Sequence, residues 1–265
     1  MIKVLEAKNI TYRVGSRELI SQVSLSFTAG KLHLMIGPNG AGKSTLIKVL
    51  SRSLRPHEGR VFYDGADVAN TKEIDLAKRR AVLSQAVEVA FPLTVREVVM
   101  MGRYPHFGGR PAPVDFSIVD EMMDFFDVTE FGDRDYLTLS GGERQRVNFA
   151  RVLAQLWKTE HQVNSGFRYL FLDEPLTFLD IRHQIEFMKK VQEFSSLADV
   201  VVIGVVHDLN LAARFADQIV LIDQGRIVAN GPPDEVLTTD RIKQVFDVQP
   251  AFVRSQDGQS YIVFD

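Results

Sequence analysis

The sequence contains no cysteine, which excludes disulfide bonds and metal sites built from thiolates. Long apolar runs are also missing, because the longest one, residues 200–206, is far too short to span a bilayer and predicts a buried strand. The opening residues MIKVLEAKNITYR lack the apolar core of a signal peptide. A formal net charge of −3 gives the chain no general attraction to nucleic acid or anionic lipid. These absences predict a soluble chain in the cytoplasm.

The sequence has no internal repeat and no low-complexity linker, and basic runs are scarce as well. The one basic run, Lys78-Arg79-Arg80, is interpreted as a solvated helix face, with a binding patch as the alternative. A chain of 265 residues can bury a full core, so a single catalytic domain with an appended lobe is expected.

The most informative stretch is a glycine-rich loop, GPNGAGKST at residues 37–45. Residues 31–36 before it predict a short buried strand, and residues 45–54 carry apolar side chains at helical spacing. In that context backbone N–H groups turn toward phosphate oxygens, Lys43 reaches the β- and γ-phosphates, and Ser44 holds Mg²⁺. A glycine-rich turn without a ligand is the alternative. We expect a nucleoside triphosphate to be bound by Gly37, Asn39, Gly40, Ala41, Gly42, Lys43, Ser44 and Thr45.

Two carboxylates, Asp173 and Glu174, end the apolar strand pattern of YLFLDE. We expect this strand to lie beside the strand that leads into the phosphate loop. Asp173 would then meet Mg²⁺, usually through water, and Glu174 would polarise a water aligned with the γ-phosphate. A solvated turn is the alternative interpretation of two adjacent acids.

A second turn, Ser140-Gly141-Gly142, runs directly into a predicted helix and offers another helix N-terminus to an anion. Ser140 can cap this helix and donate to a phosphate, although the same residues would also make an ordinary cap. Two elements that grip phosphate, one of them in a helical region, indicate a nucleotide held between two copies of the chain.

The remaining patterns divide the chain into regions. Alternation in the first 30 residues or so predicts antiparallel strands, helical periodicity dominates roughly from 88 to 160, and strand patterns return from residue 169. The ending AFVRSQDGQSYIVF predicts a hairpin around Asp257-Gly258. We therefore divide one domain, 1–265, into a catalytic core (1–87 and 166–235), a helical subdomain (88–165) that carries the Ser-Gly-Gly turn, and a C-terminal extension (236–265).

The order of these motifs resembles the ATP-binding cassette (ABC) family of transporter ATPases over nearly the whole chain. The series is the phosphate loop, LSQ at 83–85, LSGGE at 139–143, YLFLDE at 169–174, Leu179-Asp180 and Val206-His207-Asp208. The resemblance implies an α/β fold, in which a P-loop NTPase core carries an N-terminal antiparallel β subdomain and an inserted helical subdomain. It also implies ATP and Mg²⁺ as cofactors.

Roles within one subunit follow from the same resemblance. Tyr12 would stack on the adenine ring, and Gln85 would sense Mg²⁺ and the attacking water while contacting the transport partner. Glu174 would be the catalytic base, and His207 would hold the γ-phosphate and the water. A half-buried aromatic, a surface amide and a structural histidine are the alternatives for Tyr12, Gln85 and His207. The metal ligands would be Ser44, Gln85 and Asp173.

Roles across a homodimer are implied too. Ser140, Gly141 and Gly142 would bind the γ-phosphate held by the opposite subunit, and Asp180 would couple the two sites. Phe178 is bulkier than the alanine that the family often has before Leu-Asp, which leaves the cross-subunit contact at this point open.

The resemblance favours a transporter motor over a soluble ABC ATPase of DNA repair or translation, because long coiled coils and a second cassette are missing. Residues 91–106 look like the corresponding stretch in importers of siderophores, haem and cobalamin. The link at 156–168 is longer than in many relatives and begins Leu-Trp, as in haem-import ATPases; a tolerated surface loop is the alternative. Haem is thus the expected cargo, with iron–siderophore complexes and cobalamin as alternatives.

The implied partners are a second ATPase subunit, an integral-membrane permease dimer and, indirectly, a periplasmic or surface substrate-binding protein. No nucleic acid is expected as a partner. The implied location is peripheral, on the cytoplasmic face of the inner membrane.

Overall fold

The computed structural model describes residues 3–84, 91–157, 166–177, 179–254 and 260–264. Its strands form a four-stranded sheet (order β2-β1-β4-β5), a six-stranded sheet (β10-β9-β3-β8-β7-β6) and a two-stranded sheet (β11-β12). The strands are β1 (Lys3–Val14), β2 (Arg17–Thr28), β3 (Lys31–Ile36), β4 (Glu58–Tyr63), β5 (Ala66–Asp67), β6 (Arg80–Leu83), β7 (Arg168–Leu172), β8 (Val200–Val205), β9 (Gln218–Asp223), β10 (Arg226–Gly231), β11 (Pro250–Arg254) and β12 (Ser260–Phe264).

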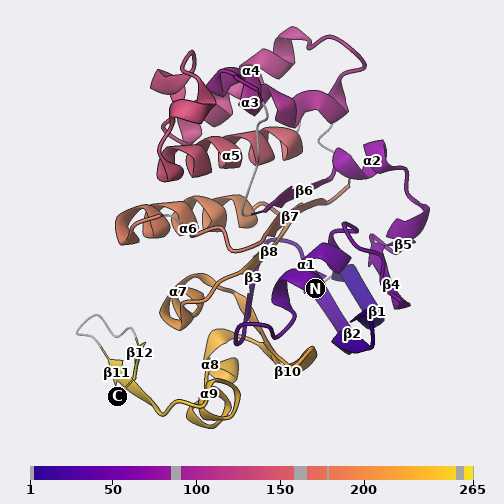
Figure 1. The fold of residues 1–265 in the computed structure, drawn as a ribbon, viewed down its shortest axis with the longest axis vertical. Coiled ribbons are helices and arrows are strands. Elements are labelled where there is room, and N and C mark those ends of the chain that lie inside the picture. The colour runs from indigo at the N-terminus through magenta and orange to yellow at the C-terminus, as the bar shows by residue number, and fades with distance from the viewer. Residues whose placement is uncertain (1–2, 85–90, 158–165, 178, 255–259, 265) are drawn as a thin grey trace.

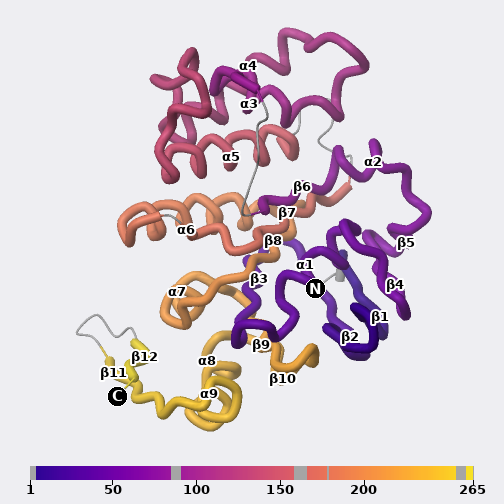
Figure 2. The backbone as a smooth tube through the Cα atoms, in the orientation of Figure 1, coloured from indigo at the N-terminus to yellow at the C-terminus, as the bar shows by residue number. Residues whose placement is uncertain are grey.

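Most helices lie around the six-stranded sheet, whereas the four-stranded and two-stranded sheets lie at the edges of the molecule, as the ribbon in Figure 1 and the tube in Figure 2 show. The α-helices are α1 (Lys43–Leu50), α2 (Glu73–Ala77), α3 (Val95–Met100), α4 (Pro113–Phe125), α5 (Gly141–Leu156), α6 (Ile181–Ser195), α7 (Leu209–Phe215), α8 (Pro233–Val236) and α9 (Thr239–Phe246). Short 3₁₀ helices are η1 (Val68–Asn70), η2 (Met101–His106), η3 (Thr129–Phe131) and η4 (Tyr136–Thr138). Within the described ranges, no helix combines the length and the apolar character that crossing a membrane requires.

The predicted N-terminal antiparallel sheet is confirmed. β1 pairs with β2 on one side and with β4 on the other, both antiparallel. Val23, Leu25 and Phe27 on β2 are buried while their neighbours are more exposed. The alternation therefore gives this sheet one face that packs against the core.

The central sheet is parallel from β6 to β9, and β10 is antiparallel to β9. The expectation that the YLFLDE strand lies beside the strand before the phosphate loop is wrong: β3 pairs with β8 and β9, whereas β7 pairs with β8 and β6. All six residues of β8 are buried, as a strand covered on both faces must be. Because a helical crossover can pass over a neighbouring position, chain order alone does not reveal the order of parallel strands.

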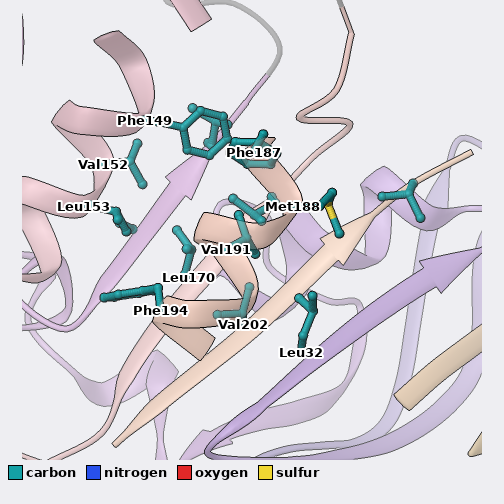
Figure 3. Packing of buried hydrophobic residues seen from close by; sticks show 14 of the residues in the cluster. Leu32, Phe149, Val152, Leu153, Leu170, Phe187, Met188, Val191, Phe194 and Val202 are labelled. Atoms are coloured by element: carbon teal, nitrogen blue, oxygen red, sulfur yellow. The ribbon is translucent and has the colours of Figure 1, made fainter. Parts of the chain in front are cut away.

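The helical region forms a layer of its own, in which α3, α4 and α5 lie beyond α6 and the sheet (Figure 1). Figure 3 shows how α5 and α6 meet: Phe149 and Phe187 have ring centroids 3.9 Å apart, and Val191 of α6 belongs to the same buried cluster as Leu170 of β7. Each such side chain contributes about 1.5–3 kcal/mol through burial of apolar area. This packing makes the layer continuous with the core below it.

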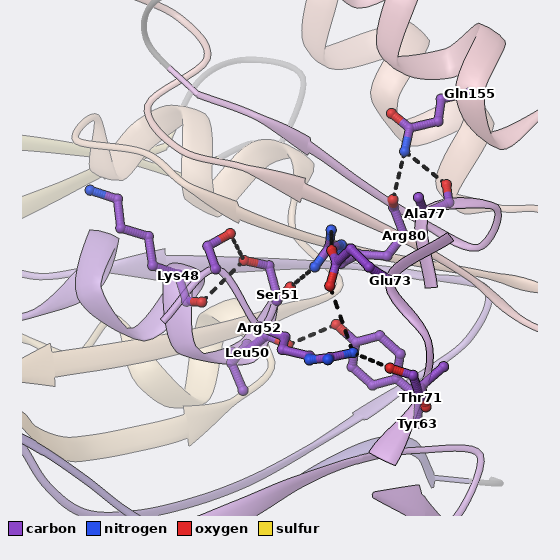
Figure 4. Close-up of polar contacts among 11 residues, drawn as sticks. Lys48, Leu50, Ser51, Arg52, Tyr63, Thr71, Glu73, Ala77, Arg80 and Gln155 are labelled. Atoms are coloured by element: carbon purple, nitrogen blue, oxygen red, sulfur yellow. Dashed lines mark hydrogen bonds and ion pairs between the residues drawn. The ribbon is translucent and has the colours of Figure 1, made fainter. Parts of the chain in front are cut away.

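The basic run at 78–80 is not a solvated helix face. Helix α2 ends at Ala77, and the chain then turns into β6, so Arg79 and Arg80 point toward neighbouring elements. Arg79 Nε donates to the carbonyl of Phe167 at 3.1 Å. Arg80 pairs with Glu73 at 2.9 Å and donates to the carbonyl of Ser51 (Figure 4). These contacts hold the ends of α1, α2 and β6 together.

The predicted C-terminal hairpin is confirmed by the pairing of β11 with β12, from Pro250 opposite Phe264 to Arg254 opposite Ser260. Its turn, with Asp257-Gly258, lies outside the described residues. The amide of Asn210 at the start of α7 bonds both backbone groups of Ile262, at 2.7 and 3.0 Å. The hairpin is therefore attached to α7.

Candidate active site

The glycine-rich loop connects β3 to α1 and is shaped by close backbone approach. Gly42, the N-cap of α1, has φ 102°, and a Cβ there would lie 2.5 Å from the carbonyl oxygen of Leu19. A Cβ on Gly37 would lie 2.0 Å from the carbonyl oxygen of Ile222. No side chain caps α1, so the first backbone N–H groups of this helix have neither a helical partner nor a side-chain cap. This arrangement suits an anion.

Lys43 closes over this loop. Its Nζ donates to the carbonyls of Gly37 at 2.8 Å and Pro38 at 2.9 Å, and the side chain is buried. Burial lowers the pKa of Lys43, while the charges of Glu174 and Asp173 oppose that shift. The ammonium thus stands between the loop and two carboxylates.

The loop and Glu174 share one cavity of about 250 Å³. Its lining brings together Asn39, Gly40, Gly42, Lys43, Ser44, Thr45 and Glu174, with Arg17 and Leu19 from β2. The sequence analysis missed Arg17 and Leu19, because no motif marks them and only the folding of β2 over the loop places them there.

Asp173 and Glu174 follow β7 but take up different roles in the packing. Asp173 is 8% exposed, and its Oδ1 is buried without a hydrogen-bond partner among the described residues. A buried carboxylate oxygen left without a partner suits a cation, so Asp173, together with the Ser44 hydroxyl, fits Mg²⁺. Glu174 has φ 52°, which lies in the left-handed region of backbone conformation.

Glu174 meets His207, which follows β8. Glu174 Oε1 and His207 Nε2 are 3.0 Å apart. A second cavity of about 240 Å³ is lined by both residues together with Thr177, Gln184 and Asp208 among others, so Glu174 borders the loop cavity and this one. The carboxylate and the imidazole can therefore act on one group placed beside the loop.

Tyr12 lies apart from this cluster. It is half-buried on β1 opposite Ile20, and its ring stands edge-on to His57 with centroids 5.1 Å apart. It does not line the cavity that holds the loop. Gln85 and Phe178 lie outside the described residues.

Ser140 begins α5 with a complete capping box. Its Oγ accepts from the N–H of Glu143 at 3.3 Å, and its own N–H donates to Glu143 at 2.7 Å. Ser140 is exposed, and α5 packs in a different apolar cluster from α1. Within one chain, the Ser140-Gly141-Gly142 turn and the phosphate loop are thus not brought together.

Asp180 caps α6 in a similar way. Its Oδ1 accepts from the N–H of His183 at 2.9 Å and lies 2.8 Å from the Nδ1 of the same residue. These bonds, the backbone one first, lower the pKa of Asp180. The carboxylate is exposed and therefore open to a second molecule.

Comparison with known proteins identifies the family. The family model described as ABC transporter matches residues 20–177. Hemin import ATP-binding protein HmuV of Rhodopseudomonas palustris (strain BisA53) is 44% identical over 98% of this chain and 93% of its own length. The protein of the same name from Bordetella pertussis (strain Tohama I) is 42% identical over 92% of each chain.

Solved structures agree in fold. A chain from an ABC transporter in an inward-facing conformation has a TM-score of 0.83 at 21% identity, covering 100% of this chain and 98% of that one. A nucleotide-free ATP-binding cassette has a TM-score of 0.74 at 23% identity, covering 93% and 96%. The predicted P-loop core with its antiparallel sheet and helical insertion is confirmed. The chain therefore belongs to the ABC transporter family and is one of its ATPases.

Proposed function

We propose that this chain is the ATP-hydrolysing subunit of a membrane importer and powers the uptake of haem through a permease. The observation that supports haem as the cargo is the similarity, at 40–44% identity, to several proteins named as hemin import ATP-binding proteins. The proposal of ATP hydrolysis is supported by the cavity that the phosphate loop and Glu174 share. Iron–siderophore complexes or cobalamin would use the same ATPase and are alternative cargoes.

Nucleotide binding rests on the loop and Lys43. The backbone N–H groups of Gly40 and of residues 42–45 receive the phosphates, and Lys43 exchanges its bonds to Gly37 and Pro38 for bonds to the β- and γ-phosphates. Ser44 and Asp173, with Gln85 by resemblance, hold Mg²⁺. When bound, this ion neutralises charge on the phosphates. Tyr12 supports the adenine ring.

Hydrolysis rests on Glu174 and His207. Glu174 accepts a proton from the water that attacks the γ-phosphate, and His207 aligns that water and the phosphate. The 3.0 Å contact between them keeps the carboxylate aimed at the cavity. A positioned base of this kind contributes about 10²–10⁴-fold to the rate.

A second copy completes the site. Because Ser140 is exposed and α5 packs apart from α1, the turn at Ser140, Gly141 and Gly142 reaches a γ-phosphate bound by another subunit. Asp180, exposed at the start of α6, couples the two sites. ATP then drives motion because it binds the closed dimer better than the open one.

The assembly would be peripheral on the cytoplasmic face of the inner membrane, with residues 91–106 and Gln85 against a permease dimer. A substrate-binding protein outside that membrane would deliver the cargo. In this cycle, closure of the dimer moves the helical subdomain at 88–165. The other parts of the chain are the catalytic core, at 1–87 and 166–235, and the C-terminal extension, at 236–265.

Deletion of the gene in its host tests the cargo. Iron-limited growth would be measured with haem, then with a siderophore, as the sole iron source. Loss of growth on haem alone, restored by the wild-type gene and not by Glu174→Gln, is the expected result. Growth on haem with failure on a siderophore would instead assign the chain to siderophore import.

A further inference from the structure

The C-terminal end of α5 is held by side chains from other elements. A helix leaves its last carbonyls without helical partners, yet four at this end accept hydrogen bonds. Arg103 Nη1 donates to the carbonyls of Ala154 at 2.7 Å and Trp157 at 3.0 Å. His106 Nε2 lies 2.8 Å from the carbonyl of Gln155, and Arg168 Nη1 donates to that of Leu156 at 3.3 Å. The cations also complement the negative end of the helix dipole.

Arg103 is the centre of this arrangement. Its side chain is 1% exposed, and its Nε donates to Asp115 of α4 at 3.0 Å. Asp115 is itself fixed, because its other oxygen accepts from the N–H of Ala112 at 2.9 Å. This buried ion pair and its additional hydrogen bonds join η2, α4 and α5.

Close backbone contact strengthens the joint. A Cβ on Gly102 would lie 2.1 Å from the carbonyl oxygen of Arg151, so η2 rests directly on α5. Gly102 and Arg103 are the buried residues of η2. The residues on either side of them face outward: Met101 is 48% exposed and Tyr104 is 69% exposed. The short 3₁₀ helix thus presents one face to α5 and another to the surroundings.

The same end of α5 is also attached to the core. Gln155 Nε2 donates to the carbonyls of Ala77 at 2.8 Å and Arg80 at 2.9 Å (Figure 4). The opposite end of the 16-residue helix carries Ser140, about 24 Å away at 1.5 Å per residue. A rotation of about 10° at the held end would therefore move Ser140 by about 4 Å.

We propose that Arg103 is a positioning residue, which fixes α5 to η2 and so holds Ser140, at the far end of α5, in place for the γ-phosphate of a second copy. The inference rests on the proposed role of Ser140 at the γ-phosphate of a second copy.

The test uses the purified full-length chain with Arg103→Lys, which keeps the charge but cannot span Asp115 and both carbonyls. We expect kcat for ATP to fall about tenfold while KM stays within about twofold, because nucleotide is bound elsewhere. Arg168→Lys is the matched control at the same helix end. Since Arg168 joins α5 to β7 and not to η2, its kcat should stay within about twofold of wild type.

A distance measurement separates positioning from loss of stability. Because the sequence has no cysteine, spin labels on Leu137→Cys of η4 (40% exposed) and Val14→Cys of β1 (59% exposed) report the distance between the segment just before α5 and the N-terminal sheet. We expect Arg103→Lys to broaden or shift this distance distribution and Arg168→Lys to leave it unchanged.

The double variant Arg103→Met/Asp115→Leu guards against a failure to fold, since apolar replacement of a buried ion pair often keeps stability. A folded double variant should again show the changed distance and the lower kcat. Wild-type kcat and distance in Arg103→Lys or in the double variant would overturn the inference. Haem uptake is measured by the growth assay and not by these experiments, so either proposal can fail while the other stands.

Discussion

His207 Nε2 lies 3.0 Å from Glu174 Oε1, although the two residues follow different strands of the central sheet. β7 and β8 are parallel neighbours, so their carboxyl ends meet at one edge. The left-handed backbone of Glu174 turns its carboxylate toward His207 and the loop cavity. Such backbone strain costs about 1–3 kcal/mol and persists where the surroundings require it. The pair is the basis of the first prediction.

Glu174→Gln should reduce the steady-state ATPase rate by about 10²–10⁴-fold, because the amide cannot accept the proton of the attacking water. ATP binding should remain, so size-exclusion chromatography with Mg·ATP should show a persistent dimer. An unchanged turnover rate would sink the assignment of Glu174 as the base.

Ser140→Arg should abolish hydrolysis without preventing ATP binding by the isolated chain. The bulky cation would occupy the space that the γ-phosphate of the second copy needs, while the loop around Lys43 is left untouched. The measurements are ATPase activity and a fluorescence titration with a nucleotide analogue. If the isolated chain lost ATP binding, a role for Ser140 in trans would be untenable.

Gly42→Ala should destabilise the loop by about 2–4 kcal/mol and eliminate ATP binding, because φ 102° disfavours an L-residue and the added Cβ meets Leu19 at 2.5 Å. Gly40→Ala is the control: its φ of 78° is strained too, but its Cβ would meet no atom within 4 Å. About 1–2 kcal/mol is expected there, from the left-handed backbone alone. Thermal melts and titrations compare the two, and equal losses would contradict the argument from close approach.

The stability of the chain should fall as the pH is lowered through about 6.5, partly because of His33. Burial lowers the pKa of this imidazole, which lies on β3 with its Nε2 3.0 Å from the carbonyl of Thr28. Below its ordinary pKa the unfolded chain takes up a proton that the folded chain resists, so the stability present above that pH is lost below it. Burial lowers the pKa of His106 in the same direction.

Melting temperatures between pH 7.5 and 5.5 check this, with His33→Gln as the comparison. The variant cannot titrate at this position and should lose less stability over the same range. An equal loss in both proteins would show that other groups cause the pH dependence.

The local parts of the site could be read from the chain because they are made by consecutive residues. The strand, loop and helix around Lys43 need only neighbouring backbone groups and the apolar periods on either side. The capping box of Ser140 with Glu143 is equally local, as is the end of β7 at Asp173. Helix and strand periods also predicted the N-terminal sheet and the terminal hairpin.

Contacts between distant residues could not be read in this way. β8 separates β3 from β7 in the central sheet, because packing decides the order of parallel strands. Arg79 and Arg80 turn toward neighbouring elements, because the chain turns after the five-residue helix α2. No sequence period encodes which side chain will cap a helix in another part of the chain. The bonds of Arg103 to the end of α5 therefore could not be predicted before the fold was known.

The amino-acid sequence by itself determined the phosphate loop, the turn at Ser140 and the carboxylates after β7, since each depends on a few adjacent residues. Only the tertiary structure decided that Glu174 meets His207 and that α5 is fixed at the end away from Ser140, because burial and long-range hydrogen bonds select those partners.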